Sequence, residues 1–235
     1  MTAQGTSIVS SLAEIRERIA RSAERAGRAA DDITLVAVSK TLPPEAIRAA
    51  YELGLRHFGE NRVQEWESKR APVADLDATW HLIGHLQSNK ARRAANLFNR
   101  VDSVDSIVLA QKLDAAAASE AKQLRVLIEV HLGGEGTKSG VREEDLSALA
   151  ESIAKLHHLE LIGLMAIPPY FDEPEQVRPY FKKLRELRDR LSAQLEKPLD
   201  VLSMGMSHDF EIAIEEGATE IRVGTALFGE RSKKE

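Results

Sequence analysis

The chain has 235 residues, 43% of them hydrophobic, which is enough to bury the core of one large domain or two small ones. With 32 basic and 37 acidic residues its formal net charge is -5, so it lacks the basic excess expected of a protein that binds nucleic acid or an anionic membrane. The absence of cysteine excludes a disulfide framework, a thiolate metal site and a cysteine nucleophile.

The N-terminal segment is dense in Glu and Arg and has no apolar core of the kind a signal peptide carries. Leu12, Ile15 and Ile19 recur at helical spacing, which predicts a leading helix within residues 1–30. No later stretch contains the roughly 18 consecutive apolar residues that a membrane span needs. We therefore predict a cytoplasmic protein without a membrane partner.

Short apolar segments follow the leading helix, and longer segments with helical periodicity separate them. The first of these segments, "ITLVAV", is almost continuously apolar, as expected of a strand that is buried on both faces. The eight predicted strands span residues 33–38, 55–59, 79–84, 100–104, 124–132, 159–167, 199–205 and 219–226. The helices predicted between them span residues 43–54, 61–70, 88–98, 105–119, 142–156, 181–195 and 207–217.

This strict alternation of strands and helices predicts parallel βαβ units. Eight such units in about 200–250 residues favour a single (β/α)8 TIM barrel, with an open, doubly wound sheet as the alternative. No segment has the composition of a linker. The prediction is one α/β domain over residues 1–235, with the barrel at about 33–230 and an extra helix before it.

Lys40 stands at the end of the first predicted strand, in "VAVSKTLPPEAI". The functional groups of a (β/α)8 barrel lie at the C-terminal ends of its strands. One interpretation is a solvated lysine at the barrel rim. The other is a Schiff-base lysine, because a partly desolvated amine has a lowered pKa and attacks aldehydes. A phosphate-binding site beside Lys40 would favour the second interpretation.

Two segments near the C-terminus have the composition of phosphate-binding loops. Ser203 and Ser207 in "SMGMSHD" lie between a strand and a helix, and Gly224 and Thr225 in "VGTA" lie at the end of the last strand. Backbone N–H groups at such turns bind phosphate together with neighbouring hydroxyls, although glycine and serine are also common in ordinary turns. Barrels commonly bind phosphate after strands 7 and 8, and strand 8 of a closed barrel adjoins strand 1.

Seven motifs stand in order between about residue 33 and residue 230, which is nearly the whole chain. They are "VAVSKTLPPEAI", "FGENRVQE", "WHLIGHLQSNK", "TKSG", "GLMAI", "SMGMSHDFEIAI" and "IRVGTALFG". Together they resemble the pyridoxal 5′-phosphate (PLP) homeostasis proteins, the YggS/PROSC family. The resemblance implies a single barrel like the N-terminal domain of alanine racemase, PLP as the cofactor, and a role in the intracellular homeostasis of this form of vitamin B6.

The resemblance also implies roles for individual residues. Lys40 would carry PLP as a Schiff base, and Arg222 would face the pyridine nitrogen. The other implied cofactor contacts are Ser203, Ser207, Gly224 and Thr225 at the phosphate, Asn61 near the cofactor, and Met204 packed around it. Lys138, in "TKSG", belongs to a further motif whose role is open.

The implied position of Arg222 predicts weak catalysis. A cation beside the pyridine nitrogen keeps that nitrogen unprotonated, and the ring is then a poorer electron sink for a carbanion. Alanine racemase draws an acid–base group from a second domain, whereas this sequence ends at Glu235, directly after the last predicted strand. These features favour a binding protein without catalytic residues and with, at most, trace racemase turnover.

Three functions remain open from the sequence. The favoured one is a monomeric PLP-homeostasis protein that passes PLP to apo-PLP enzymes and binds no nucleic acid. The second is a single-domain, PLP-dependent amino-acid racemase. The third is an aldolase that uses Lys40 directly on a phosphorylated sugar.

Two further patterns are interpreted as structural. His81 and His85 have the spacing of a zinc site on a helix, but their segment is predicted to be a strand followed by a loop, so no metal site is predicted. The basic segment "SNKARR", which contains Lys90, Arg92 and Arg93, is interpreted as a solvated helix face.

Overall fold

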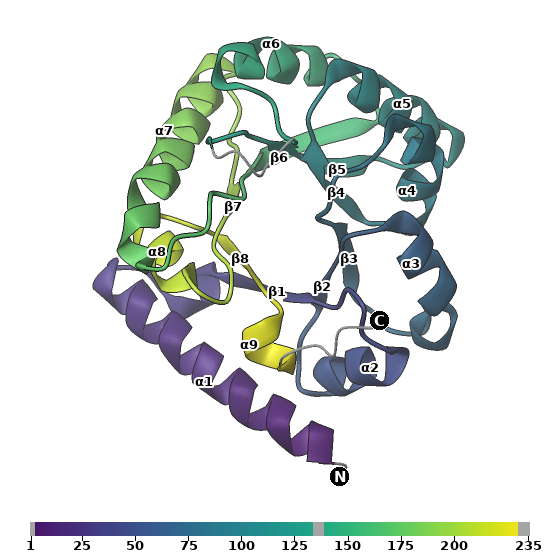
Figure 1. Cartoon of the computed structure of the whole chain (residues 1–235). Helices are drawn as coiled ribbons and strands as arrows, with labels where there is room; N and C mark the ends of the chain where they lie inside the picture. The colour runs from purple at the N-terminus through teal and green to yellow at the C-terminus, as the bar shows by residue number, and fades with distance from the viewer. Residues whose placement is uncertain (1–2, 134–138, 230–235) are drawn as a thin grey trace.

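Eight parallel strands close into a barrel in chain order, in a computed structural model that describes residues 3–133 and 139–229 (Figure 1). The ring closes where β1 pairs with β8, with Val36 opposite Arg222. Closure rules out the open, doubly wound sheet and confirms the predicted (β/α)8 barrel. The strands are β1 (Thr34–Val38), β2 (His57–Glu60), β3 (Thr79–Leu82), β4 (Arg100–Val104), β5 (Leu124–Glu129), β6 (Leu159–Met165), β7 (Val201–Ser203) and β8 (Glu220–Val223).

The helices form a ring around the barrel, and the leading helix lies outside that ring (Figure 1). They are α1 (Ala3–Arg25), α2 (Pro44–Glu52), α3 (Val63–Lys69), α4 (Ala91–Leu97), α5 (Ile107–Ser119), α6 (Glu143–Ile153), α7 (Arg178–Gln194), α8 (Phe210–Glu215) and α9 (Thr225–Phe228). The leading helix α1 packs on α8 and α9, and Arg18 of α1 pairs with Glu211 of α8 at 2.6 Å. Arg92 and Arg93 are exposed on α4, as predicted for a solvated face.

The eight predicted strands are all present, but most are shorter than predicted. The last two differ most, since β7 covers only Val201–Ser203, and β8 ends at Val223 with Thr225 beginning the short helix α9. The apolar sequence continues beyond the last residue that pairs with a neighbouring strand, because the helices also cover the first residues of the following loops. Apolar composition therefore located each strand better than it located the end of the strand.

Alternate residues of each strand face either the surrounding helices or the barrel interior. On β8, Ile221 and Val223 belong to the hydrophobic layer between strands and helices, whereas Glu220 and Arg222 face the interior. The barrel interior is therefore partly polar, and its charged side chains must find partners there. Among the described residues, no helix has both the length and the apolarity that crossing a membrane requires.

Candidate functional site

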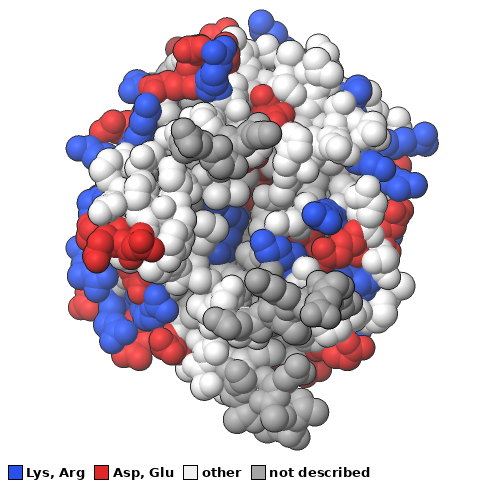
Figure 2. All heavy atoms as spheres, in the orientation of Figure 1, with Lys and Arg blue, Asp and Glu red and all other residues white. Residues whose placement is uncertain are grey.

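The C-terminal ends of the strands surround an opening in one face of the molecule, which we call the barrel mouth. Figure 2 shows this face hollowed at its centre, with Lys or Arg atoms inside the hollow and Asp or Glu atoms above it. The eight residues predicted to contact the cofactor lie on β7 and β8 or in the segments that follow β1, β2, β7 and β8. Because β8 pairs with β7 and β1, and β1 pairs with β2, these residues occupy one continuous arc of the barrel.

Lys40 lies in a tight turn directly after β1. The N–H of Leu42 donates to the carbonyl of Ser39 at 3.1 Å and closes this turn. Thr41 adopts φ 63°, a left-handed conformation that is rare for a β-branched residue. Its N–H donates to the carboxylate of Glu65. Backbone strain of this kind clusters at functional sites, where the surrounding structure holds it in place.

A buried ion-pair group holds this turn from behind. The ammonium group of Lys69 donates to the Ser39 carbonyl at 2.8 Å and pairs with Glu60 at 2.9 Å and with Glu65 at 2.8 Å. The hydroxyl of Ser39 donates to Glu60 Oε1 at 2.6 Å, while Glu60 Oε2 is buried without a partner among the described residues. Burial raises the pKa of Glu60, and Lys69 opposes that rise. We did not single out Glu60 or Lys69 from the sequence, although Glu65 and Lys69 have the i,i+4 spacing of a helical ion pair.

Asn61 follows β2, and the segment after β3 packs tightly against it. A Cβ atom on Gly84 would lie only 2.4 Å from the carbonyl oxygen of Asn61. The hydroxyl of Ser103 donates to the Gly84 carbonyl at 2.7 Å. Only a glycine at position 84 allows this close approach, which positions the backbone of Asn61 at the barrel mouth.

Arg222 is one of the buried cations of the barrel interior, with 3% of its surface exposed. Its guanidinium donates to the hydroxyl of Ser203 at 2.7 Å and to the carbonyl of Ala166 at 2.8 Å. Burial lowers the pKa of Arg222, while nearby carboxylates, Glu220 first among them, raise it. Ser203 is thus oriented toward Arg222, and its hydroxyl proton is available for one further hydrogen bond.

The loops after β7 and β8 are joined directly, because the N–H of Ala226 donates to the hydroxyl of Ser207 at 3.2 Å. Gly205 has φ 91°, and a Cβ atom there would lie 2.5 Å from the Cβ of Ala213, so the first loop requires glycine where it crosses α8. Met204 is fully buried and packs in the hydrophobic core.

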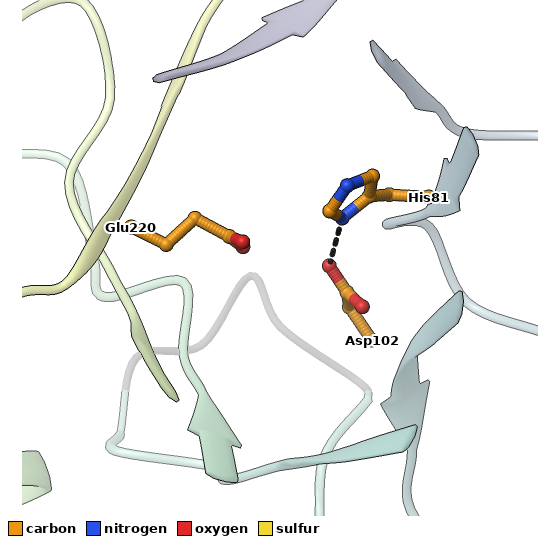
Figure 3. A group of neighbouring side chains, drawn as sticks. All are labelled: His81, Asp102 and Glu220. Atoms are coloured by element: carbon orange, nitrogen blue, oxygen red, sulfur yellow. Dashed lines mark hydrogen bonds and ion pairs between the residues drawn. The ribbon is translucent and has the colours of Figure 1, made fainter. Parts of the chain in front are cut away.

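A second charged group fills the barrel interior at the level of Glu220, and Figure 3 shows His81, Asp102 and Glu220 converging there. Their possible ligand atoms lie within 4.8 Å of one another, a spacing that could hold a metal ion. The guanidinium of Arg100 is already bound there, at 2.6 Å from Asp102 and 2.5 Å from Glu220. A metal cation would have to compete with this cation. His85 does not join the group, because its side chain is 54% exposed and lies 3.4 Å from Asp105.

The neighbouring histidine of β2 extends this interior group. His57 Nδ1 lies 3.0 Å from His81 Nε2, and His81 Nδ1 lies 3.4 Å from Asp102. Burial, followed by the charge of His81, lowers the pKa of His57 to about 4. Sequence reasoning considered His81 only for a metal and missed the other members, because they are far apart in the chain and share no motif.

Of the "TKSG" motif, Lys138 lies outside the described residues, whereas Ser139 donates its hydroxyl proton to Glu129 at 2.8 Å. Glu129 ends β5, two strands from β7 and three strands from β8 in the ring. Its own sequence context, "LIEVHL", did not mark it as functional.

Comparisons with known proteins agree with the fold. The family model for the N-terminal domain of alanine racemase matches residues 10–232. A pyridoxal phosphate homeostasis protein of Aquifex aeolicus is 50% identical over 94% of this chain and 96% of its own length. The protein of the same name from Escherichia coli K12 is 42% identical over 97% of this chain and 99% of its own length.

Two solved structures extend the comparison. The structure of PipY from Synechococcus elongatus PCC7942 with PLP bound superposes with a TM-score of 0.84, at 41% identity, over 94% of this chain and 100% of that one. An alanine racemase of Clostridium difficile 630 superposes with a TM-score of 0.75 over 97% of this chain but only 58% of its own, at 16% identity. The second likeness concerns the fold alone.

Proposed function

Because the chain belongs to the family of pyridoxal phosphate homeostasis proteins, we propose that it binds PLP in its barrel mouth, as a Schiff base with Lys40, and serves as a PLP carrier. The relative solved with PLP bound supports this cofactor. In this proposal the chain forms one PLP-binding domain, acts as a monomer, and delivers PLP to apo-enzymes that depend on it.

The observation that carries the proposal is that Lys40 follows a strand next to the two loops after β7 and β8, whose composition predicts phosphate binding. Lys40 follows β1, which pairs directly with β8, and the loops after β7 and β8 are joined by the hydrogen bond between Ser207 and Ala226. A phosphorylated aldehyde needs an amine at one end and hydroxyl and N–H donors at the other. In the proposal the mouth would supply both, with Gly224 and Thr225 as further phosphate contacts next to the residue that binds Ser207, Ala226.

The chemistry that bound PLP supplies is an aldehyde that reacts with amines and a ring that withdraws electrons. In the proposal, Arg222 lies at the pyridine nitrogen and keeps it unprotonated, because two cations in contact repel. Its bonds to Ser203 and Ala166 hold the guanidinium in place. In the proposal Asn61 would lie near the cofactor, and Met204 would pack around it from the core.

Little or no catalytic turnover follows from the same residue. A ring that cannot gain a proton at its nitrogen stabilises a substrate carbanion poorly, so the proposed protein holds PLP without racemising amino acids efficiently. Its curated relatives are named for PLP homeostasis, which agrees with this view. A single-domain racemase is the second candidate, favoured only by the shared alanine racemase fold.

The test of binding is borohydride reduction of PLP-loaded protein followed by peptide mass mapping. We expect the reduced cofactor on Lys40, and we expect Lys40→Ala to lose the visible absorbance of bound PLP while keeping the far-UV spectrum of the folded chain. Reduced cofactor on another lysine, such as Lys138, would refute the assignment.

The test of turnover is chiral analysis of alanine, serine and glutamate after long incubation with PLP-loaded protein. We expect only trace conversion. A positioned acid–base group contributes about 10²–10⁴ in rate, but it can do so only if the cofactor ring stabilises the carbanion. In the proposal Arg222 weakens the ring in that role. A rate of about 1 s⁻¹ or more, within the range of ordinary enzymes, would establish the racemase instead.

A further inference from the structure

Two carboxylates lie at the C-terminal ends of the neighbouring strands β4 and β5, and we call Glu129 and Asp105 the acidic wall. Glu129 is the last residue of β5, and Asp105 comes directly after β4. The charges of Asp105, Arg222 and His85 all act on the Glu129 carboxyl. Arg222 lies on β8, His85 follows β3 and Asp105 follows β4. The charges that act on Glu129 therefore come from three other parts of the barrel.

The strand pattern gives the direction in which Glu129 points. On β5, Val126 and Ile128 belong to the hydrophobic layer against the helices. Because successive side chains alternate between faces, Glu129 projects from the interior face of the strand. The residue is only 4% exposed, so its carboxyl group is held inside the mouth rather than at the outer rim.

Among the described residues, fewer positive partners contact the acidic wall than contact the buried carboxylates Glu60 and Asp102. Glu60 pairs with Lys69, and Asp102 pairs with Arg100. By contrast, the partners that the described residues offer to the wall are the Ser139 hydroxyl, at 2.8 Å from Glu129, and the His85 ring, at 3.4 Å from Asp105. Burial raises the pKa of Glu129, and the charge of Asp105 raises it further. A cation arriving at the wall would relieve both effects.

The proposed function supplies the reason for a cation to arrive. A carrier that gives up a covalently held aldehyde must admit an amine, and an amine at neutral pH enters as an ammonium group. A phosphate monoester adds about one and a half to two negative charges to the mouth and strengthens the attraction. An α-amino acid would bring its own carboxylate against the two wall carboxylates, whereas a lysine side chain carries its charge on an aliphatic stem.

Resting on that proposed function, we propose that the acidic wall receives the ammonium group of a lysine side chain from the protein that takes PLP. Glu129 removes a proton from this ammonium. The new carbon–nitrogen bond forms at the aldehyde carbon of the cofactor as the bond to Lys40 breaks. The protons lost by the incoming nitrogen end on the nitrogen of Lys40, so charge and electrons balance and no oxidant is needed.

A cavity beside the wall has the right lining for such a stem. It is an open groove of about 270 Å³ between α5 and α6, and it adjoins the acidic wall at Asp105, which forms part of its lining. Ile107, Val141 and Leu149 supply apolar surface, and Asp145 adds a second carboxylate. An aliphatic chain that ends in an ammonium group suits this combination of apolar and acidic surface.

The experiment measures how amines displace PLP from the loaded full-length protein. Three probes are used. Nα-acetyl-lysine amide carries a side-chain ammonium group, alanine carries an α-ammonium group and a carboxylate, and methoxyamine is uncharged at neutral pH. Absorbance gives the half-saturating concentration of each probe, and mass spectrometry after borohydride reduction gives the PLP that remains on Lys40. We expect the wild-type protein to respond to the lysine amide at lower concentration than to alanine.

For Glu129→Gln we expect the half-saturating concentration of the lysine amide to rise about tenfold or more, as for the loss of one charge-assisted contact, with no change for methoxyamine. Glu129→Asp, which keeps the charge, should recover most of the response. Asp105→Asn should act in the same direction and serves if Glu129→Gln folds poorly. Glu160→Gln removes the same charge from the start of β6, at the opposite end of the barrel, and should behave as the wild type.

Equal effects of Glu129→Gln on the lysine amide and methoxyamine, or no effect on either, would overturn the acidic-wall proposal while PLP binding stood. A preference for alanine that depends on the wall would overturn the assignment to lysine side chains. The proposed function fails separately, if wild-type protein retains no PLP on Lys40 before any amine is added.

Discussion

Replacing Lys69 by methionine tests how the turn that carries Lys40 is held. The ammonium group lies within 2.9 Å of Glu60 and 2.8 Å of both Glu65 and the Ser39 carbonyl, and the side chain is 10% exposed. Removing one partner of a buried ion pair costs about 3–5 kcal/mol, because the other charge is left without compensation. Glu60 keeps the hydrogen bond from Ser39 and can take up a proton, so we expect the lower end, about 3 kcal/mol of unfolding free energy near neutral pH.

The pH dependence of this loss identifies its cause. Burial raises the pKa of Glu60 in the folded protein, and Lys69 lowers it. In Lys69→Met that pKa rises further, whereas the unfolded value stays at about 4.3. The folded variant then binds more protons than the unfolded chain, so its stability falls as the pH rises from about 5 to 7. The difference between variant and wild type should therefore be smaller at about pH 5 than at about pH 7.

The assay is urea unfolding of PLP-free protein, followed by far-UV circular dichroism at both pH values. The matched control is the double variant Lys69→Met with Glu60→Gln, whose neutral amide still accepts the bond from Ser39 and should recover most of the lost stability. A cost below about 1 kcal/mol, as for an exposed ion pair, or the same cost at both pH values, would refute the reasoning.

Three further outcomes follow from the site and the interior. Ser207→Ala removes the hydroxyl that joins the two loops through Ala226, and equilibrium dialysis should show PLP binding weakened about ten- to hundredfold, with pyridoxal affected far less. Gly205→Ala places a Cβ atom 2.5 Å from the Cβ of Ala213 at φ 91°, and thermal unfolding should show a loss of about 1–3 kcal/mol or more. The ring of His57 should titrate near pH 4 by NMR, and the protein should lose stability as the pH falls from about 6.5 toward that value, because the unfolded chain binds the proton more readily.

The position of the proposed site could be predicted from local sequence features. Lys40 ends an apolar segment, and Ser207 and Gly224 lie in loops after the last two strands, where barrels commonly bind phosphate. In the structure these residues follow the neighbouring strands β1, β7 and β8, as the predicted ring requires. The supporting contacts could not be predicted in the same way. Nothing in "GENRVQEWESK" shows that Lys69 lies under the carbonyl of Ser39.

The sequence by itself determined the barrel and the place of its mouth, because apolar strands and helical periodicity are local signals that repeat along the chain. Only the tertiary structure decided which charges meet inside it. Arg100 and Glu220 are 120 residues apart, yet one guanidinium nitrogen of Arg100 lies 2.5 Å from both carboxylate oxygens of Glu220, and the charge of Arg222 on β8 lowers the pKa of Glu129 on β5. The physical reason is that the alternation of strand residues says which side chains point inward, whereas the stagger of the closed sheet sets the layer in which each one lies.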